Sequence, residues 1–311
     1  MELIAYADAL ANEDKSRTGL IVVLIFMLID SYIPNNSRLK QHIEYYYFFK
    51  TDDSTFNSSY YAFPNIYTSV NIHKNINYNI EPYKILVSST TEQNFSCIIQ
   101  GIRQVPLFVQ LSGIIDKVTI VFKPLGLNPF ITKPYLQIAP EHSQCFSEWN
   151  KSPHFTTFLS KFYATNDNAA RVRELEIFLL SILKEKEGLS FLYQAITLLS
   201  DFSQEHSIND ISSLLNVSLR TFNREFKKHL GISPIGFRII ARFRHSLQSS
   251  LISDQFKRLT DVGYNSNYYD QAYFIKTYKK LTGLNPRSFL NSVEKLAGEK
   301  LIFQFLNQTS G

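Results

Sequence analysis

A thirteen-residue motif occurs twice in the C-terminal third of this 311-residue chain. The copies run from Phe222 to Pro234 and from Phe274 to Pro286, 52 residues apart, and both read F-x-[RK]-x-[FY]-K-K-x-x-G-[IL]-x-P. A shorter match precedes each copy, because Ile208-Asn-Asp-Ile corresponds to Leu259-Thr-Asp-Val, 51 residues later. Such a repeat indicates that one supersecondary unit is used twice, with one extra residue in the turn of the second copy.

Each copy has the pattern of two helices joined by a tight turn. In the first copy, Ser207 is placed to cap a helix over Ile208–Leu215. Asn216-Val217 would form the turn, because asparagine tolerates the left-handed backbone conformation. Ser218 is then placed to cap a second helix over Leu219–His229. This arrangement predicts a helix-turn-helix.

The second helix of the first copy places polar side chains opposite an apolar stripe. Phe222 and Phe226 are four residues apart and are expected to face the core. The other side carries Arg220, Asn223, Arg224 and Lys227. Arginine can bind guanine bidentately in the major groove, asparagine can bind adenine, and lysine can neutralise phosphates. One copy could equally be a helical pair with a solvated basic face, but two copies with matching glycine and proline stops favour DNA binding.

The positive charge of the chain is concentrated around the repeat. Residues 205–290 hold 13 Lys and Arg against 6 Asp and Glu, a net charge of +7, whereas the remainder holds 19 against 21. A basic C-terminal domain on a nearly neutral body is typical of a nucleic-acid-binding protein.

The repeat resembles the DNA-binding domain of the AraC/XylS family of bacterial transcription regulators. The segments that carry the resemblance are Ser218-Leu-Arg-Thr-Phe-Asn-Arg-Glu-Phe-Lys-Lys and Tyr268-Tyr-Asp-Gln-Ala-Tyr-Phe-Ile-Lys-Thr-Tyr-Lys-Lys. In that family two helix-turn-helix units are joined by a long helix, here expected over Ile235–Ser250. Each unit inserts a recognition helix into successive major-groove segments of double-stranded DNA.

The resemblance assigns roles to individual positions. The base-reading residues would be Arg220, Asn223 and Arg224 in the first unit and Gln271, Tyr273 and Lys276 in the second. Phosphate contacts are expected from Ser218, Lys227, Lys228, Lys279 and Lys280. Two positions depart from the family pattern: Asn267 stands where glycine is usual, and Gly263 where a small helix former is usual. Gly263 should weaken its helix by about 0.5–1 kcal/mol relative to alanine, so the second unit could be less rigid or read DNA shape.

The front of the chain reads as short strands separated by turn residues. The expected strands are Glu44–Lys50, Thr68–His73, Lys84–Ser89, Phe95–Gln100, Pro106–Gly113 and Asp116–Lys123. In Asp116–Phe122, Val118, Ile120 and Phe122 share one face, and Lys117, Thr119 and Val121 share the other. The pattern predicts a small antiparallel barrel or sandwich. Segments such as Glu44–Phe49 and Phe122–Phe130 are similar to a cupin-like sensor domain, and the loop Lys123–Phe130 is either a barrel-closing loop or a ligand site.

After Pro140 the pattern becomes helical, with helices expected over Phe155–Tyr163, Ala169–Lys186 and Leu189–Phe202. The fold class is therefore α+β, with a β-rich sensor or dimerisation domain, a helical connector and an all-α DNA-binding domain. The domain boundaries are an uncertain segment 1–30, the β domain 31–150, the connector 151–188, the DNA-binding domain 189–293 and a tail 294–311.

The N-terminal segment contains an apolar run of ten residues, Leu20–Ile29. A membrane-spanning helix needs about 20 residues, so no membrane span is expected, and the acidic residues before the run do not suit a signal peptide. Met27 is an alternative start of translation to Met1.

Enzymatic and metal sites find little support in the sequence. Cys97 and Cys145 form no CxxC pair and are expected to be buried thiols in a cytoplasmic protein. The sequence has no clustered histidines and no phosphate-binding or hydrolase motif. A cupin enzyme fused to a DNA-binding module and a DNA-repair alkyltransferase are therefore disfavoured, and an adaptor that keeps the fold without binding DNA is harder to exclude.

No cofactor is expected. The partners to consider are double-stranded DNA, RNA polymerase, a small-molecule effector and a second copy of the chain.

Overall fold

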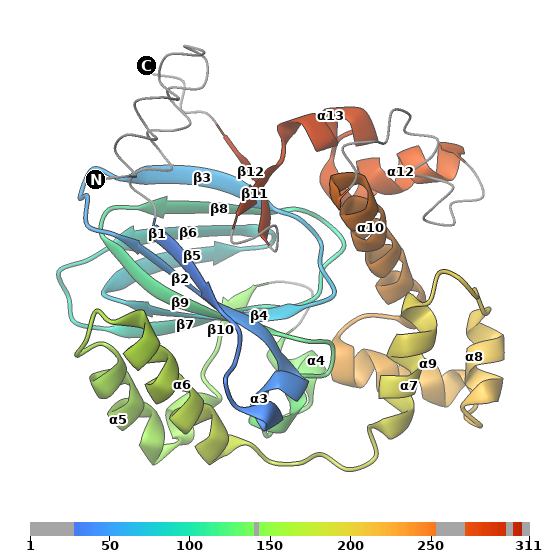
Figure 1. Cartoon of the computed structure of the whole chain (residues 1–311), viewed down its shortest axis with the longest axis horizontal. Coiled ribbons are helices and arrows are strands. Elements are labelled where there is room, and N and C mark those ends of the chain that lie inside the picture. The colour runs from blue at the N-terminus through green and yellow to red at the C-terminus, as the bar shows by residue number, and fades with distance from the viewer. Residues whose placement is uncertain (1–27, 140–142, 253–270, 297–300, 307–311) are drawn as a thin grey trace.

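The computed structural model describes residues 28–139, 143–252, 271–296 and 301–306. These residues form a β domain and a helical domain that lie side by side (Figure 1). The predicted α+β class, with the β domain first, is confirmed. Residues 1–27, which include both candidate start sites, lie outside the described residues, as do Gly263 and Asn267.

Sheet A has six strands, and each neighbouring pair is antiparallel. In spatial order they are β1 (Leu28–Tyr32), β2 (Ile43–Thr51), β9 (Ile115–Phe122), β4 (Thr68–Lys74), β7 (Phe95–Gln100) and β10 (Gln144–Cys145). β2, β9 and β4 are long and rich in β-branched and aromatic residues, which suit a buried pleated surface. Cys97 in β7 is buried as expected, but Cys145 is exposed because β10 lies at the edge of the sheet.

Sheet B also has six strands. In spatial order they are β11 (Glu294–Leu296), β12 (Leu301–Phe305), β3 (Asn57–Ala62), β8 (Leu107–Ser112), β6 (Lys84–Ser89) and β5 (Ile76–Glu81). The expectation of a purely antiparallel domain is wrong at one place, because β6 and β8 are parallel, with Ile85 opposite Val109. The intervening strand β7 belongs to sheet A, so the chain leaves sheet B after β6 and returns in the same direction.

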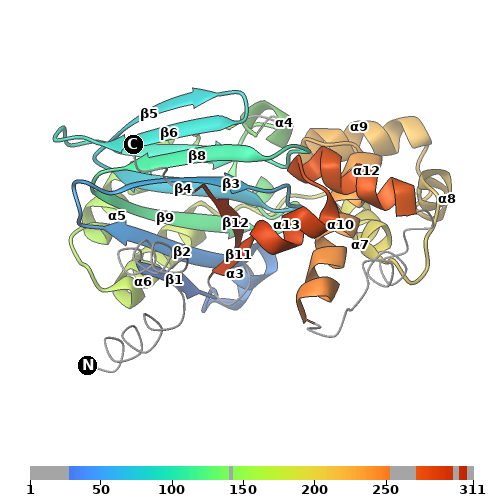
Figure 2. The same cartoon turned by 90° about the horizontal axis from the view of Figure 1, so that it is seen from above.

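The two sheets pack face to face into a sandwich (Figure 2). The core between them joins Phe49, Ile98 and Ile115 of sheet A to sheet-B residues such as Tyr60 and Val109. Burying such side chains stabilises the fold by roughly 1.5–3 kcal/mol each.

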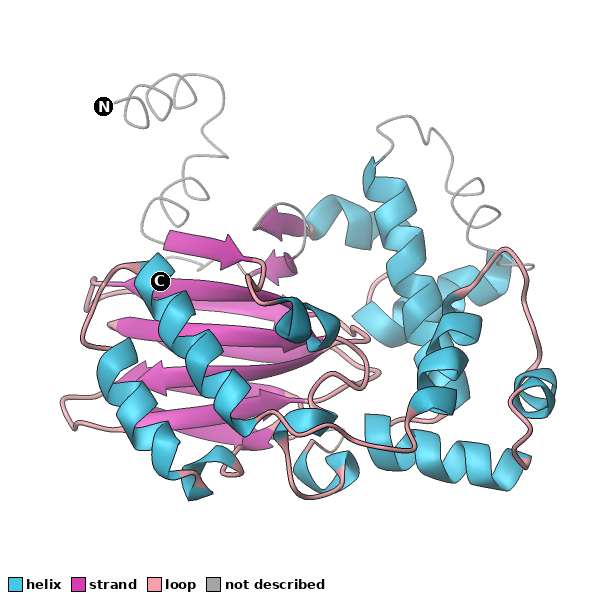
Figure 3. Ribbon diagram, turned by 60° about the horizontal axis from the view of Figure 1, so that its bottom comes forward, coloured by secondary structure: helices cyan, strands magenta, loops and turns pink. Residues whose placement is uncertain are grey.

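The central strand β9 is covered on both faces. Val118, Ile120 and Phe122 belong to a core that includes residues of α5 (Pro153–Phe162) and α6 (Asn168–Ile182). The helices expected as a connector therefore lie across the outer face of sheet A (Figure 3). Lys117 and Thr119 alternate with these residues and are also buried.

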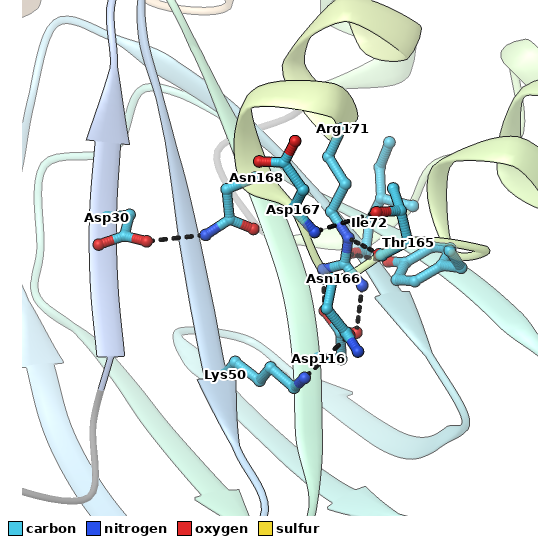
Figure 4. Close-up of polar contacts among 10 residues, drawn as sticks. Asp30, Lys50, Ile72, Asp116, Thr165, Asn166, Asp167, Asn168 and Arg171 are labelled. Carbon is cyan, nitrogen blue, oxygen red and sulfur yellow. Dashed lines mark hydrogen bonds and ion pairs between the residues drawn. The ribbon is translucent and has the colours of Figure 1, made fainter.

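Arg171 connects α6 to the start of β9. Its guanidinium donates two hydrogen bonds to Asp116, at 2.8 and 2.9 Å, and its Nε donates to the Thr165 carbonyl at 2.7 Å (Figure 4). Arg171 is buried, and a bidentate pair of this kind fixes both position and orientation. Next to it, Lys50 of β2 donates to Asn166, and Asn168 donates to Asp30 of β1.

The helical domain begins after Gly188. Its helices are α7 (Ser190–Ser200), α8 (Ile208–Leu214), α9 (Leu219–Leu230), α10 (Pro234–Ile252), α12 (Gln271–Thr282) and α13 (Pro286–Ser292). Shorter helices of the β domain are α3 (Ser37–His42), η1 (Asn128–Phe130), α4 (Tyr135–Ile138) and η2 (Trp149–Lys151). In the described residues no helix is long and apolar enough to cross a membrane.

The end of the chain returns to the β domain. β12 pairs antiparallel with β3, with Phe303 opposite Ala62, and β11 pairs with β12. The segment expected as a tail thus extends sheet B, and the helical domain is connected to the β domain at both of its ends.

Candidate nucleic-acid interface

The first helix-turn-helix consists of α8 and α9. Ser207 and Asp210 form a reciprocal capping box at the start of α8, in which the Asp210 N–H donates to Ser207 Oγ at 3.1 Å. Asn216 in the turn has φ of 53°, the left-handed conformation that asparagine tolerates. Ser218 caps α9 by accepting from the Thr221 N–H at 3.1 Å. The predicted caps and turn are confirmed, and the Ser218 hydroxyl, expected at a phosphate, has this capping role in the free protein.

Helix α9 separates an apolar face from a basic one. Phe222, Phe226 and Leu230 are buried, and the two phenylalanine rings contact each other edge to face. Arg220, Arg224, Lys227 and Lys228 are exposed. Asn223 is partly buried and donates to the Leu219 carbonyl at 2.9 Å. Four of the five side chains predicted to contact DNA from this helix are therefore exposed on its surface.

Glu225 is a member of this face that the sequence reasoning missed. Its carboxylate accepts from Arg224 Nε at 2.9 Å, and it lies 3.4 Å from Lys228 Nζ and 3.6 Å from His229 Nε2. The hydrogen bond from Arg224 and the nearby Lys228 charge hold the pKa of Glu225 below its usual value. Arg224 is thus held by an anion in the free protein and must exchange it for a base edge.

Helix α12 presents the candidates of the second unit. Gln271, Tyr273 and Lys276 are exposed, as are Lys279 and Lys280. Phe274, Tyr278 and Leu281 anchor the opposite face, and the buried Tyr278 hydroxyl lies 2.8 Å from Ser246 Oγ of α10. Lys280 differs from the prediction in one respect, because its Nζ donates to Gln104 of the β domain at 3.4 Å. The first helix and turn of this unit, from Leu259 to Asn267, lie outside the described residues.

The long helix α10 joins the two units, as predicted. α9 and α12 contact α10 near its opposite ends (Figure 1). Arg220 and Arg224 therefore occupy a different part of the molecular surface from Gln271 and Lys276, as two separate recognition helices require.

Gly231 ends α9 where the helix meets the β domain. Its φ is 77°, and a Cβ at this position would come within 2.9 Å of Tyr135 Cε1 in α4. A residue other than glycine would strain the backbone and collide with the ring. The glycine stop within the repeat thus also permits close packing of α4 on α9.

Apolar side chains and two arginines lie where the two domains meet. Phe63 of the β domain packs edge to face on Phe289 of α13, with ring centroids 4.7 Å apart. Arg244 of α10 donates to the Pro64 and Phe63 carbonyls at 2.6 and 2.9 Å, and Arg103 donates to the Ala62 carbonyl at 2.8 Å. No local sequence signal marks these residues, because their partners lie far away in the chain.

Burial and, to a smaller extent, the neighbouring Arg244 guanidinium together lower the pKa of Arg103 to about 10. Burial also lowers the pKa of Arg244 to about 10. Among the carboxylates whose side chains the structure describes, a set that leaves out Glu294, none forms an ion pair with either arginine, and Arg103 Nε is buried without a hydrogen-bond partner among the described side chains. These residues also contain no group of three or more His, Cys, Asp or Glu side chains that could hold a metal ion.

Comparisons with known proteins agree with this geometry. Residues 211–292 match a family model described as a helix-turn-helix domain. The chain is 28% identical over 132 residues to the HTH-type transcriptional activator RhaS of Enterobacter sp. (strain 638). This match covers 40% of this chain and 47% of the relative. The chain thus spans about half the length of the curated relative that it matches.

Two solved structures of ToxT from Vibrio cholerae are similar over most of the chain. One has a TM-score of 0.42 and 12% identity, covering 85% of this chain and 98% of ToxT. The other, wild-type ToxT bound to an unsaturated fatty acid, has a TM-score of 0.40 and 12% identity, covering 85% of this chain and 94% of ToxT. Together, the family match, the relative and the caps, turn and basic face of α9 show that the C-terminal part of this chain is a helix-turn-helix domain, as the resemblance to the AraC/XylS family predicts.

Proposed function

We propose that the protein is a transcription regulator that binds double-stranded DNA sequence-specifically through α9 and α12. The observation that carries this proposal is the exposed row of Arg220, Arg224, Lys227 and Lys228 on a helix whose other face is fully anchored. A rigid helix of this kind fits the major groove, where arginine can pair with guanine. α12 would enter the next major-groove segment with Gln271, Tyr273 and Lys276.

The two kinds of contact on α9 have different expected consequences. Arg224 would read a base, so Arg224→Ala should cost about 1–3 kcal/mol and relax the preference at one base pair. Lys228 would contact a phosphate, so Lys228→Ala should weaken binding to all sequences and flatten its salt dependence. The difference between the variants separates base reading from general attraction to DNA.

The full chain can be tested by selection from a randomised duplex library, followed by sequencing, at two salt concentrations. A motif with two parts roughly 10 base pairs apart is expected. Salt-sensitive binding without any enriched motif would contradict the proposal that the protein binds DNA sequence-specifically. Equal effects of both variants on every sequence would contradict base reading by Arg224.

We further propose that a small anionic molecule controls this activity from the interface between the domains. Arg103 and Arg244 support this proposal, because each is buried, they come from different domains, the Arg244 charge lowers the pKa of Arg103, and no carboxylate whose side chain the structure describes pairs with either. Uncompensated charge in a desolvated site is unfavourable. A carboxylate or phosphate between the two guanidinium groups would remove that penalty and hold the domains together.

Thermal unfolding of the full chain with inorganic phosphate and with short monocarboxylates tests this control. A concentration-dependent rise in the melting temperature that is lost in Arg103→Met supports an anion at this site. An equal rise in the wild type and in Arg103→Met would contradict it.

A further inference from the structure

The two recognition helices can be aligned residue by residue. α9 and α12 are each twelve residues long and begin 52 positions apart, which is also the spacing of the repeat. Their buried positions coincide under this shift, because Phe222 corresponds to Phe274 and Phe226 to Tyr278, and all four side chains are buried. Each exposed residue of α9 therefore has a counterpart on α12 that faces the same direction relative to the core.

The phosphate-contacting positions of the two helices agree, whereas the base-reading positions differ. The lysines at positions 227 and 228 recur as Lys279 and Lys280. The residues expected to read bases from α9 are Arg220, Asn223 and Arg224, and their counterparts on α12 are, in the same order, Ala272, Ile275 and Lys276. α12 thus keeps one cation at these positions and has apolar side chains in place of two that form hydrogen bonds.

Ile275 presents an apolar side chain on the basic surface of α12. It is 37% exposed, and Gln271 and Lys279 lie four residues before and after it, so they are its neighbours on the helix surface. Single exposed apolar residues are common on proteins. Ile275 differs from an ordinary one, because it lies among side chains expected to contact DNA and corresponds to Asn223.

An isoleucine side chain can recognise one feature of the major groove. It has no hydrogen-bond donor or acceptor, and the alkyl group that a base edge presents there is the 5-methyl group of thymine. A contact between the two removes apolar surface from water on both sides. The β-branched side chain is also stiff, so it loses little rotamer freedom in the contact. A polar base edge at the same place would lose water without gaining a partner.

We propose that Ile275 is a specificity-determining residue that contacts the 5-methyl group of a thymine in the DNA segment bound by α12. This inference rests on the proposed function. The two halves of the site are then read by different chemistry, with hydrogen bonds from the arginines of α9 and an apolar contact beside Lys276 on α12. The selected motif should therefore contain a preferred thymine in the α12 half.

Exchange of thymine for uracil in the selected duplex tests this contact. 2′-Deoxyuridine keeps every hydrogen-bonding group of thymidine and lacks the 5-methyl group. The α12 half is the one in which Lys276→Ala changes the preferred base. Each thymine of this half is exchanged in turn, and binding of the full chain is measured by fluorescence anisotropy. One exchange should weaken binding of the wild type about fourfold, which corresponds to the loss of one buried methyl group.

Ile275→Ala removes the side chain that would sense the methyl group. This variant should bind the thymine and uracil duplexes with affinities within about 1.5-fold of each other, and the difference from the wild type measures the coupling between side chain and methyl group. Ile177→Ala is the matched control, because Ile177 is 62% exposed on α6 of the β domain. It should discriminate between the two duplexes as the wild type does. Circular dichroism establishes that each variant is folded.

Three results would overturn the inference. The first is a wild type that has no preferred thymine in the α12 half or that is indifferent to every exchange there. The second is an equal effect of uracil on the wild type and on folded Ile275→Ala. The third is a loss of affinity in Ile275→Ala that is the same for both duplexes while discrimination persists. Absence of a two-part motif in the wild type would instead reject the proposed function, so the two failures are distinguishable.

Discussion

Replacing Lys117 by methionine is expected to stabilise the protein. Lys117 is 4% exposed and lies inside the sandwich, with its Nζ 5.6 Å from the ring centroids of Tyr47 and Phe49. No carboxylate of the described residues pairs with it, and burial lowers the pKa of Lys117 to about 8 from 10.5. One pKa unit corresponds to 1.36 kcal/mol, so keeping the charge at neutral pH costs about 3 kcal/mol of folding free energy. Methionine has a similar length, and the lost cation–π contacts offset about 1 kcal/mol, which leaves a gain of about 2 kcal/mol.

The gain has a defined pH dependence. Below pH 8 the amine is protonated in both the folded and the unfolded protein, and the full penalty applies. Between pH 8 and 10.5 only the unfolded protein keeps the proton, so the penalty falls as the pH rises. The difference in unfolding free energy between Lys117→Met and the wild type should therefore shrink between pH 7 and 9.5.

Urea unfolding can be followed by the fluorescence of Trp149, the only tryptophan of the chain, which is buried in the core of the β domain. Lys161→Met, a change at an exposed position of α5, is the control and should stay within about 0.5 kcal/mol of the wild type. A Lys117→Met protein that is no more stable at pH 7, or whose advantage does not depend on pH, would refute the reasoning.

Three further changes test other parts of the fold. Arg171→Leu leaves a carboxylate without its buried partner and should destabilise the β domain by about 3–5 kcal/mol in urea unfolding; a loss below about 1 kcal/mol would show that the pair is dispensable. Gly231→Ala should lower the free energy of unfolding by at least about 1 kcal/mol because of the positive φ alone, and the thermal midpoint should fall accordingly. An unchanged midpoint would contradict tight packing of α4 on α9. Burial lowers the pKa of His42, His73 and His229 from 6.5, so stability should fall as the pH drops below 6.5, because the unfolded chain then binds more protons. Equal urea midpoints at pH 7.5 and 5.5 would contradict this linkage.

The local chemistry of the first helix-turn-helix could be predicted from the sequence. Ser207, Asn216, Ser218 and Gly231 act through hydrogen bonds or backbone angles within a few residues of themselves. The spacing of Phe222 and Phe226 likewise defines the buried face within one helix. These features depend only on neighbouring residues, so they can be predicted without the remainder of the fold.

The contacts between distant segments could not be predicted in the same way. Asn128 and His229 are 101 positions apart, and Arg244 and Phe63 are 181 positions apart. Nothing in either neighbourhood specifies the partner. Similarly, alternation in β9 predicts which residues share a face with Lys117, but only the packing of sheet B shows that this face is also buried.

The shared core between the domains limits how regulation can work. Phe63, Ile102 and Leu125 of the β domain belong to the same buried cluster as the helices of the DNA-binding domain. Exposing three such side chains costs roughly 1.5–3 kcal/mol each, before the loss of the Arg244 hydrogen bonds and of the β12 pairing. Allosteric coupling free energies are typically about 1–3 kcal/mol, which is too small to separate the domains. An effector can, however, shift a buried hydrogen-bonded contact by that amount. Asn128 and His229 make such a contact at the C-terminal end of α9, so we expect the proposed control to act through a small movement within an intact interface.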